Sequence, residues 1–213
     1  YNLVVDSGRI RIYVVLGHVL GWLIYYFSLG SVTVRLSNAV IAFLRRIFNH
    51  IKINEREVII VEGLHALNPI ITKELPSDRL YKIYINVSSR IYDNGKEIVL
   101  NKRNMRFVRR LVRDYNFRGN SVERTFQMWV TVRYGEDTYL FPYRHNADVK
   151  INTIHLYETC VLKETAIKLL NEVEKDSAFY KESQRLIRNL ERFPGLDKNY
   201  IPENSLLREF VKF

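Results

Sequence analysis

The chain has 213 residues, of which 47% are hydrophobic, which is enough apolar material for one globular domain with a sizeable core. Its 33 lysines and arginines outnumber its 23 acids, and the net charge of +10 favours an anionic partner, namely nucleic acid, a membrane surface or a phosphorylated small molecule. The single cysteine, Cys160, excludes an internal disulfide and fits a reducing compartment such as the cytoplasm.

Residues 12–34 form an apolar segment without any Asp, Glu, Lys or Arg. A helix of this length would cross a bilayer, and Arg45 and Arg46 would then mark its cytosolic side. The β-branched and aromatic residues of the segment also fit two buried strands joined near Gly30. The segment therefore predicts either a membrane anchor with a cytosolic domain behind it or part of a folded core.

After residue 57, short apolar runs alternate with longer amphipathic segments. We expect strands at 58–61, 81–87 and 147–152, a short helix after Pro69, and helices at 97–115, 121–132, 156–173 and 176–193, the last packed on the sheet. Strands that alternate with helices predict a parallel α/β sheet flanked by helices. Ligands of such sheets gather at the carboxyl ends of the strands, which is where Glu62 lies.

The helix expected at 97–115 carries a stripe of arginines. The positions i, i+3, i+4 and i+7 of one face are occupied by Arg106, Arg109, Arg110 and Arg113, while the other face is apolar. Guanidinium groups this close repel one another unless carboxylates or phosphates lie opposite, and arginine binds phosphate oxygens in bidentate fashion. Arg118 would extend the stripe into the next loop. The alternative is a solvated basic face with Asp114 and Glu123 as partial counter-charges.

Several blocks, in this order, resemble one family of enzymes. They read VIIVEGLHALNP, RFVRRLVRDYNFRGNSVERTFQMW, VRYGEDTYLFPYRHNADVKINTIHLYE and IPENSLLREFV. Over about residues 51–213 the chain is similar to the uridine kinase and phosphoribulokinase family. The likeness is strongest to the bacterial and protist nucleoside kinases that are often fused behind a TGS and threonyl-tRNA-synthetase-like region. The resemblance implies a P-loop NTPase-like parallel sheet with a helical lid.

What the resemblance implies for function is transfer of the γ-phosphate of ATP or GTP to a nucleoside hydroxyl, with Mg²⁺ as cofactor. In the family, the acid that ends the VEG strand lies beside the Mg²⁺ and triphosphate, and this role would fall to Glu62. A strand end holds a carboxylate oxygen rigidly, and Mg²⁺ prefers such oxygens, often through water. The resemblance also places His65 in the following loop, where a hydrogen bond with Asn68 or a substrate contact would be its role.

The arginine helix resembles the lid of the family, which closes over the phosphates. The resemblance makes Arg110, Arg113 and Arg118 contacts of the transferred phosphate, with Arg106 and Arg109 as further phosphate or substrate ligands on the same face. Asp114 would orient Arg113 or Arg110 rather than take a proton. Positioned cations of this kind stabilise the charge that develops on the transferred group.

The segment before the last expected strand is a candidate for a second part of the site. Tyr143, Arg144 and His145 lie in the stretch TYLFPYRHNADV and would line the pocket of the base or of the acceptor. The alternative for an aromatic side chain in this position is packing in the core.

One departure from the family pattern concerns the phosphate-binding loop. No Gly-x-x-x-x-Gly-Lys-Ser/Thr string occurs in the sequence, and the one Gly-Lys pair, Gly95-Lys96, is followed by Glu97. The acid that the family carries after its first helix is also missing. Residues 1–45 occupy the place of both and are predicted to be foreign to the family, whereas residues 46–213 are predicted to be the C-terminal portion of a kinase-like domain.

Three hypotheses follow for the whole chain. It is a fragment or a misread copy of a working kinase, a pseudokinase that retains an arginine-lined anion site, or a membrane-anchored protein with a kinase-like cytosolic domain. Binding of nucleic acid is the weakest alternative, because charge alone supports it and no recognisable binding module accompanies the charge.

Overall fold

A computed structural model describes residues 12–15, 59–63, 66–72 and 76–213. The chain divides into two compact units. The sheet unit comprises residues 1–85 and 134–151, and the helical unit comprises residues 86–133 and 152–213.

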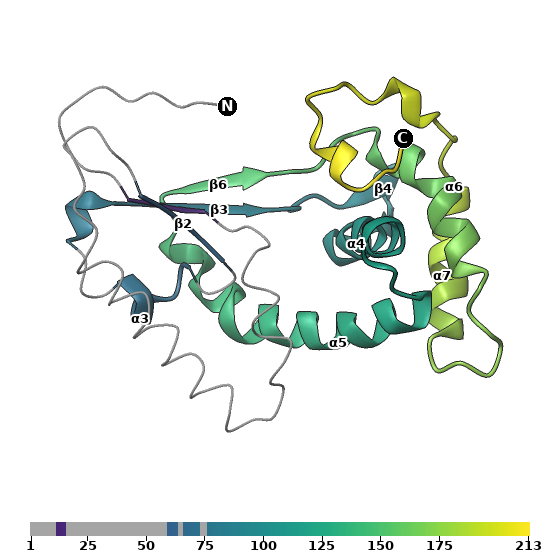
Figure 1. The fold of residues 1–213 in the computed structure, drawn as a ribbon, viewed down its shortest axis with the longest axis horizontal. Coiled ribbons are helices and arrows are strands. Elements are labelled where there is room, and N and C mark those ends of the chain that lie inside the picture. The colour runs from purple at the N-terminus through teal and green to yellow at the C-terminus, as the bar shows by residue number, and fades with distance from the viewer. Residues whose placement is uncertain (1–11, 16–58, 64–65, 73–75) are drawn as a thin grey trace. The chain divides into compact units, whose positions relative to one another are not determined.

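The sheet unit is built on strands β1 (Ile12–Val15), β2 (Ile59–Glu62), β3 (Leu80–Asn86) and β6 (Val149–Asn152), in the order β2-β1-β3-β6 (Figure 1). β1 pairs in parallel with both β2 and β3. On the other side of β3, Asp148 N donates to Lys82 O and Thr153 N donates to Asn86 O, so the bonds advance together along both strands, as in a parallel pair. The predicted parallel α/β sheet is therefore confirmed.

β1 corrects one prediction for the apolar segment at residues 12–34. Its first four residues form an inner strand of the sheet, because β-branched and aromatic side chains suit a strand, and not the beginning of a membrane helix. The rest of the segment, residues 16–34, lies outside the described residues. Among the helices that the structure describes, none combines the length and the apolarity needed to cross a bilayer.

Short elements complete the sheet unit. They are α3 (Pro69–Thr72) and the 3₁₀ turns η2 (Ser77–Arg79) and η3 (Phe141–Asn146). A small core of Leu67, Tyr84 and Leu140 packs against Phe141 and Tyr143 of η3. Asn68 precedes α3, and its Oδ1 accepts a hydrogen bond of 3.0 Å from Ile70 N, which satisfies one donor at the start of that turn.

The helical unit contains a hairpin of β4 (Ile91–Asp93) and β5 (Glu97–Leu100), followed by α4 (Lys102–Arg118). α5 (Val122–Tyr139) begins in this unit and continues into residues of the sheet unit. α6 (Glu158–Leu170), α7 (Tyr180–Glu191) and the 3₁₀ turns η4 (Lys198–Tyr200) and η5 (Leu206–Glu209) follow. α4 packs against α6, and α6 packs against α7.

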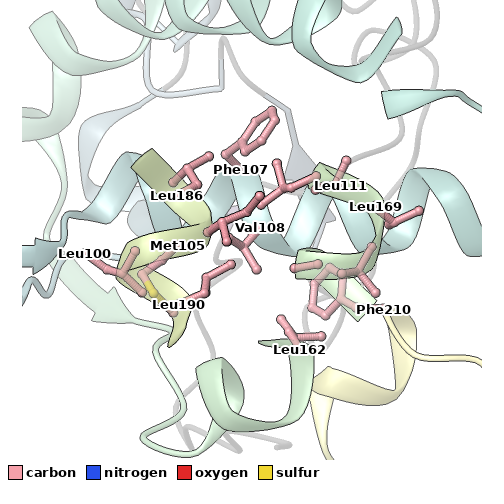
Figure 2. Close-up of a cluster of buried hydrophobic side chains, with 14 of the residues drawn as sticks. Leu100, Met105, Phe107, Val108, Leu111, Leu162, Leu169, Leu186, Leu190 and Phe210 are labelled. Carbon is pink, nitrogen blue, oxygen red and sulfur yellow. The ribbon is translucent and has the colours of Figure 1, made fainter. Parts of the chain in front are cut away.

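The core of the helical unit lies between these helices. Figure 2 shows Met105, Val108 and Leu111 of α4 among side chains from α6, α7 and the C-terminal segment, including Leu162, Leu186, Leu190 and Phe210. All are buried, most of them completely. The apolar face predicted for the arginine helix is therefore the face that holds α4 in place, except at Tyr115, which was expected on this face and is 45% exposed.

Three predicted helices differ from the structure. The helix expected at 121–132 continues to Tyr139 as α5. Residues 97–100 were expected to begin the arginine helix, but they are the second strand of the hairpin, whose turn at Asn94 and Gly95 has φ values of 47° and 71°. The helix starts at Lys102 because the side chain of Asn101 accepts hydrogen bonds from Arg103 N and Asn104 N, at 2.9 and 3.0 Å. The last helix packs on α6 instead of the sheet, and Ser183 Oγ donates to Leu170 O at 2.6 Å.

Gly119 ends α4 directly after the arginine stripe. Its φ of 62° is left-handed, and its N–H donates to Asp114 O. We expect Gly119→Ala to lower the free energy of unfolding by about 1–2 kcal/mol, because a Cβ is strained in this conformation. Urea denaturation measures the change. Gly119→Asn should lose less, since asparagine tolerates the left-handed region, and an equal loss in both variants would contradict the explanation by backbone strain.

Candidate anion-binding site

The carboxylate of Asp114 is the centre of an arginine cluster in the second half of α4. It is completely buried, and Arg113 donates to its Oδ1 from Nε and Nη2 at 3.1 and 2.9 Å. Arg118 Nη1 lies 3.2 Å from Oδ1, and Arg110 Nε lies 3.2 Å from Oδ2. Arg110 and Arg118 reach the carboxylate because residues four apart are neighbours on a helix. We call these four residues the Asp114 cluster.

The Asp114 cluster carries more positive than negative charge, since three guanidinium groups share one carboxylate. Burial lowers the pKa of Arg110 and of Arg113, and the neighbouring arginines lower it further, while Asp114 raises it. Repulsion and desolvation thus act against the protonated arginines. Asp114, together with Glu209 in the case of Arg113, offsets them only in part. An anion bound here would relieve this imbalance.

The cluster is open to solvent at Arg118 and Arg110, whose side chains are 29% and 18% exposed, compared with 11% for Arg113. Although Arg110 Nε and Asp114 Oδ2 are 3.2 Å apart, neither atom makes a hydrogen bond with a residue that the structure describes. Charge holds this pair, without a directed bond between the two atoms. Arg113 and Asp114 form the buried base of the cluster, and Arg110 and Arg118 form its accessible part.

Arg109 belongs to a different set of contacts. Its Nε donates to Glu158 Oε1 at 3.1 Å, and its Nη2 donates to the other Glu158 oxygen and, at 2.5 Å, to Thr153 O. Both side chains are buried, and the Phe210 ring centroid lies 5.7 Å from the Arg109 guanidinium carbon. We call Arg109 and Glu158 the buried ion pair. The phosphate contact predicted for Arg109 stays a prediction, and its guanidinium is occupied by α6 and the preceding loop.

Burial argues against one interpretation of the arginine face, the solvated basic face. A solvated basic face would leave its arginines exposed, but Arg109 and Arg113 are only 7% and 9% exposed. Arg106 is half-buried, with its guanidinium carbon 5.7 Å from the Trp129 ring centroid. The arginine face is thus part of the packed structure. Its arginines contact Glu158, Asp114 and the ring of Trp129.

Glu62 lies in the sheet unit, at the carboxyl end of β2. The register pairs it with Val15, the last residue of β1, so both strands end at the same level. Its side chain is half-buried, and the buried Gly63 follows. Mg²⁺ in kinases takes one or two carboxylates together with substrate phosphates and water, so one carboxylate at this strand end fits the metal. In the described ranges, no three or more His, Cys, Asp and Glu residues gather into a metal cluster.

The remaining predicted site residues lie in or near η3 or outside the described ranges. Tyr143 is half-buried and packs against the Leu67, Tyr84 and Leu140 core, whereas Arg144 and His145 are exposed. Their roles as pocket residues stay predictions, as does the role of His65, which lies outside the described residues.

Sequence reasoning missed Glu158 and Thr153. Glu158 is the first residue of α6, and its Oε2 also accepts a hydrogen bond from His155 N at 2.9 Å. The available signal is the acid in the first turn of an expected helix, which indicates a helix start but not a partner 49 residues earlier in the chain.

Comparison with known proteins identifies one family. The model of the phosphoribulokinase/uridine kinase family matches residues 23–159, which is more than half of the chain and includes β2, α4 and α5. The match begins inside the segment 1–45, whereas the resemblance seen in the sequence begins near residue 51. Neither a curated protein nor a solved structure matches the chain significantly.

Proposed function

The chain belongs to the phosphoribulokinase/uridine kinase family and carries a kinase-type domain, and we propose that this domain binds ATP or GTP and serves transfer of the γ-phosphate to a nucleoside hydroxyl. The Asp114 cluster supports this function most strongly, because its three arginines are oriented by one buried carboxylate and carry excess positive charge. Preorganised cations of this kind stabilise transferring phosphoryl groups.

The proposed function assigns the following roles to residues of the chain. Arg110 and Arg118 would bind phosphate oxygens, since they are the accessible members of the cluster. Arg113 and Asp114 would hold them in orientation from the buried side. Within the sheet unit, taken by itself, Glu62 would be the ligand of Mg²⁺, directly or through water. When bound, Mg²⁺ and the nucleotide supply the transferable phosphoryl group and a divalent charge that neutralises its oxygens.

A second candidate function is nucleotide binding without turnover. The sequence contains no Gly-x-x-x-x-Gly-Lys-Ser/Thr string, whose backbone N–H groups and lysine cradle the phosphates in P-loop enzymes. A chain of this kind would keep the arginine cluster as a binding site and lose phosphoryl transfer. The two functions share the same ligand and differ only in turnover.

Replacing an accessible arginine of the cluster tests the proposed site. We expect Arg110→Gln to weaken ATP binding roughly tenfold to a hundredfold, because a hydrogen bond to a charged group is lost. Isothermal titration calorimetry in the presence of Mg²⁺ measures this affinity. Arg185→Gln is the matched control, since Arg185 is an exposed arginine of α7 paired with Glu182. Equal affinities in the wild type and Arg110→Gln would remove the cluster from the site.

Turnover then separates the two functions. Nucleoside-dependent consumption of ATP by the wild-type chain supports the kinase, and tight binding without consumption supports the second candidate. A chain that binds neither ATP nor GTP overturns both.

A further inference from the structure

The more accessible side of α4 is not made of arginines alone. Arg103, Arg106 and Arg110 follow one another at spacings of three and four residues along this side and are half-buried. Seven residues after Arg110, close to two helical turns, the same side carries Phe117, which is 53% exposed. An exposed aromatic ring therefore stands at the end of a positively charged stripe, one helical turn beyond Arg113 of the Asp114 cluster.

Tyr115 is a second exposed aromatic residue of α4 and serves as a comparison for Phe117. It is also exposed, at 45%, and it belongs to the same last turns of α4. Positions two residues apart differ by about 200° around a helix, so its side chain leaves α4 on nearly the opposite side from Phe117. Of these two exposed rings, Phe117 is the one that shares the side of Arg110.

We propose that Phe117 is the stacking surface for the aromatic ring of a ligand whose phosphates are held by the Asp114 cluster. Phe117 and the cluster together then recognise nucleotides and not phosphate groups in general. This inference rests on the proposed function and names the ligand class of that same site. A ligand that contacts both features must carry a flat ring one to two helical turns away from its phosphates, as a nucleotide does.

Charge and surface chemistry support this ligand. The excess positive charge of the cluster favours an anion, while the exposed ring of Phe117 offers an apolar face with a negative quadrupole. A base that stacks on the ring of Phe117 covers this apolar face and lies next to the arginines. Proteins bind nucleotides of single strands by this combination of an aromatic ring and positive charge. An inorganic phosphate would leave the ring exposed to water.

Two ligands that differ only in the presence of a nucleoside provide the test. Inorganic tripolyphosphate and ATP are titrated into the wild-type chain, Phe117→Ala, Phe117→Leu and Phe117→Trp by calorimetry in one Mg²⁺ buffer. Phe117→Ala is expected to weaken ATP binding roughly 5- to 150-fold and to leave tripolyphosphate binding unchanged, because stacking is lost and the phosphate contacts remain. Phe117→Trp should keep the preference for ATP, whereas Phe117→Leu should lose most of it.

Tyr115→Ala is the matched control, because it removes an exposed aromatic ring of similar size from the other side of the same turns. It is expected to change neither affinity. Phe117 is exposed, so its variants should keep the fold, and their unfolding curves verify this.

The remaining outcomes separate this inference from the proposed function. If Phe117→Ala weakens both ligands equally or neither, the stacking role is wrong and the phosphate site stands. If the wild type binds neither ligand, the proposed function fails, and the inference fails with it. If a ten-nucleotide single strand shows the dependence on Phe117 and ATP does not, the site is built for a nucleic-acid strand and the mononucleotide assignment is overturned.

Discussion

Replacing Asp114 by asparagine is expected to lower the free energy of unfolding by about 3–5 kcal/mol, because it leaves buried arginine charge without its counter-charge. Asp114 is fully buried and is the carboxylate that Arg110, Arg113 and Arg118 share. Asparagine keeps the shape and one acceptor oxygen of the side chain, so the loss reports charge and not a cavity. Urea denaturation followed by circular dichroism measures it.

A matched variant shows whether burial is the cause. Glu182→Gln removes one partner of the exposed pair with Arg185, in which the arginine and glutamate side chains are 42% and 46% exposed. Exposed ion pairs contribute about 0–1 kcal/mol, so this variant should lose much less than Asp114→Asn. Added sulfate should stabilise Asp114→Asn more than the wild type, since an anion can replace the missing charge. Equal losses in the two variants would mean that the arginines of α4 are solvated in solution.

The fold was largely predictable from local pattern. The run VIIV predicted a strand that ends at Glu62, and β2 is that strand. Its cover on both faces was not predicted correctly, because β2 lies at the edge of the described sheet and Ile60 is 63% exposed. The helical periodicity of the apolar residues in the sequence of α4 distinguished its apolar face from its arginine face. This periodicity exists because one face of the helix packs against α6. The hairpin at residues 91–100 was not predicted, although Asn94-Gly95 is a strong turn signal, because Glu97 and the residues after it also suit a helix.

The arginine face of α4 was predictable from the sequence, but the contacts that each arginine makes were not. Periodicity placed Arg106, Arg109, Arg110 and Arg113 on one face, yet it could not show that Arg109 reaches away from the cluster to Glu158. Partners far apart in sequence are brought together by the packing of α4 on α6, which no local pattern encodes. The same limit applied to residues 12–15, whose apolar run suits a strand and a membrane helix alike until the pairing with β2 and β3 is known.

The buried ion pair of Arg109 and Glu158 leads to the second large effect. Arg109→Met would leave the Glu158 carboxylate buried without a cation, and Glu158→Gln would leave Arg109 without an anion. Each is expected to destabilise the chain by about 3–5 kcal/mol. The double variant removes both charges of the pair, and the amide oxygen introduced by Glu158→Gln can still accept a hydrogen bond from His155 N. The double variant should therefore lose clearly less free energy of unfolding than the two single variants lose in sum. A double-mutant cycle from urea denaturation gives the coupling, expected at about 0.5–3 kcal/mol.

The same double variant decides what Arg109 does for the ligand. Its donors are engaged with Glu158 and Thr153 in the structure, so a structural role leaves the affinity for ATP unchanged once the fold is kept. The phosphate role predicted from the arginine stripe requires a loss comparable to that of Arg110→Gln. Calorimetry on the double variant therefore separates the two roles. Strict additivity of the single-variant losses would show that the pair is not coupled, because a buried ion pair must respond to the removal of its partner.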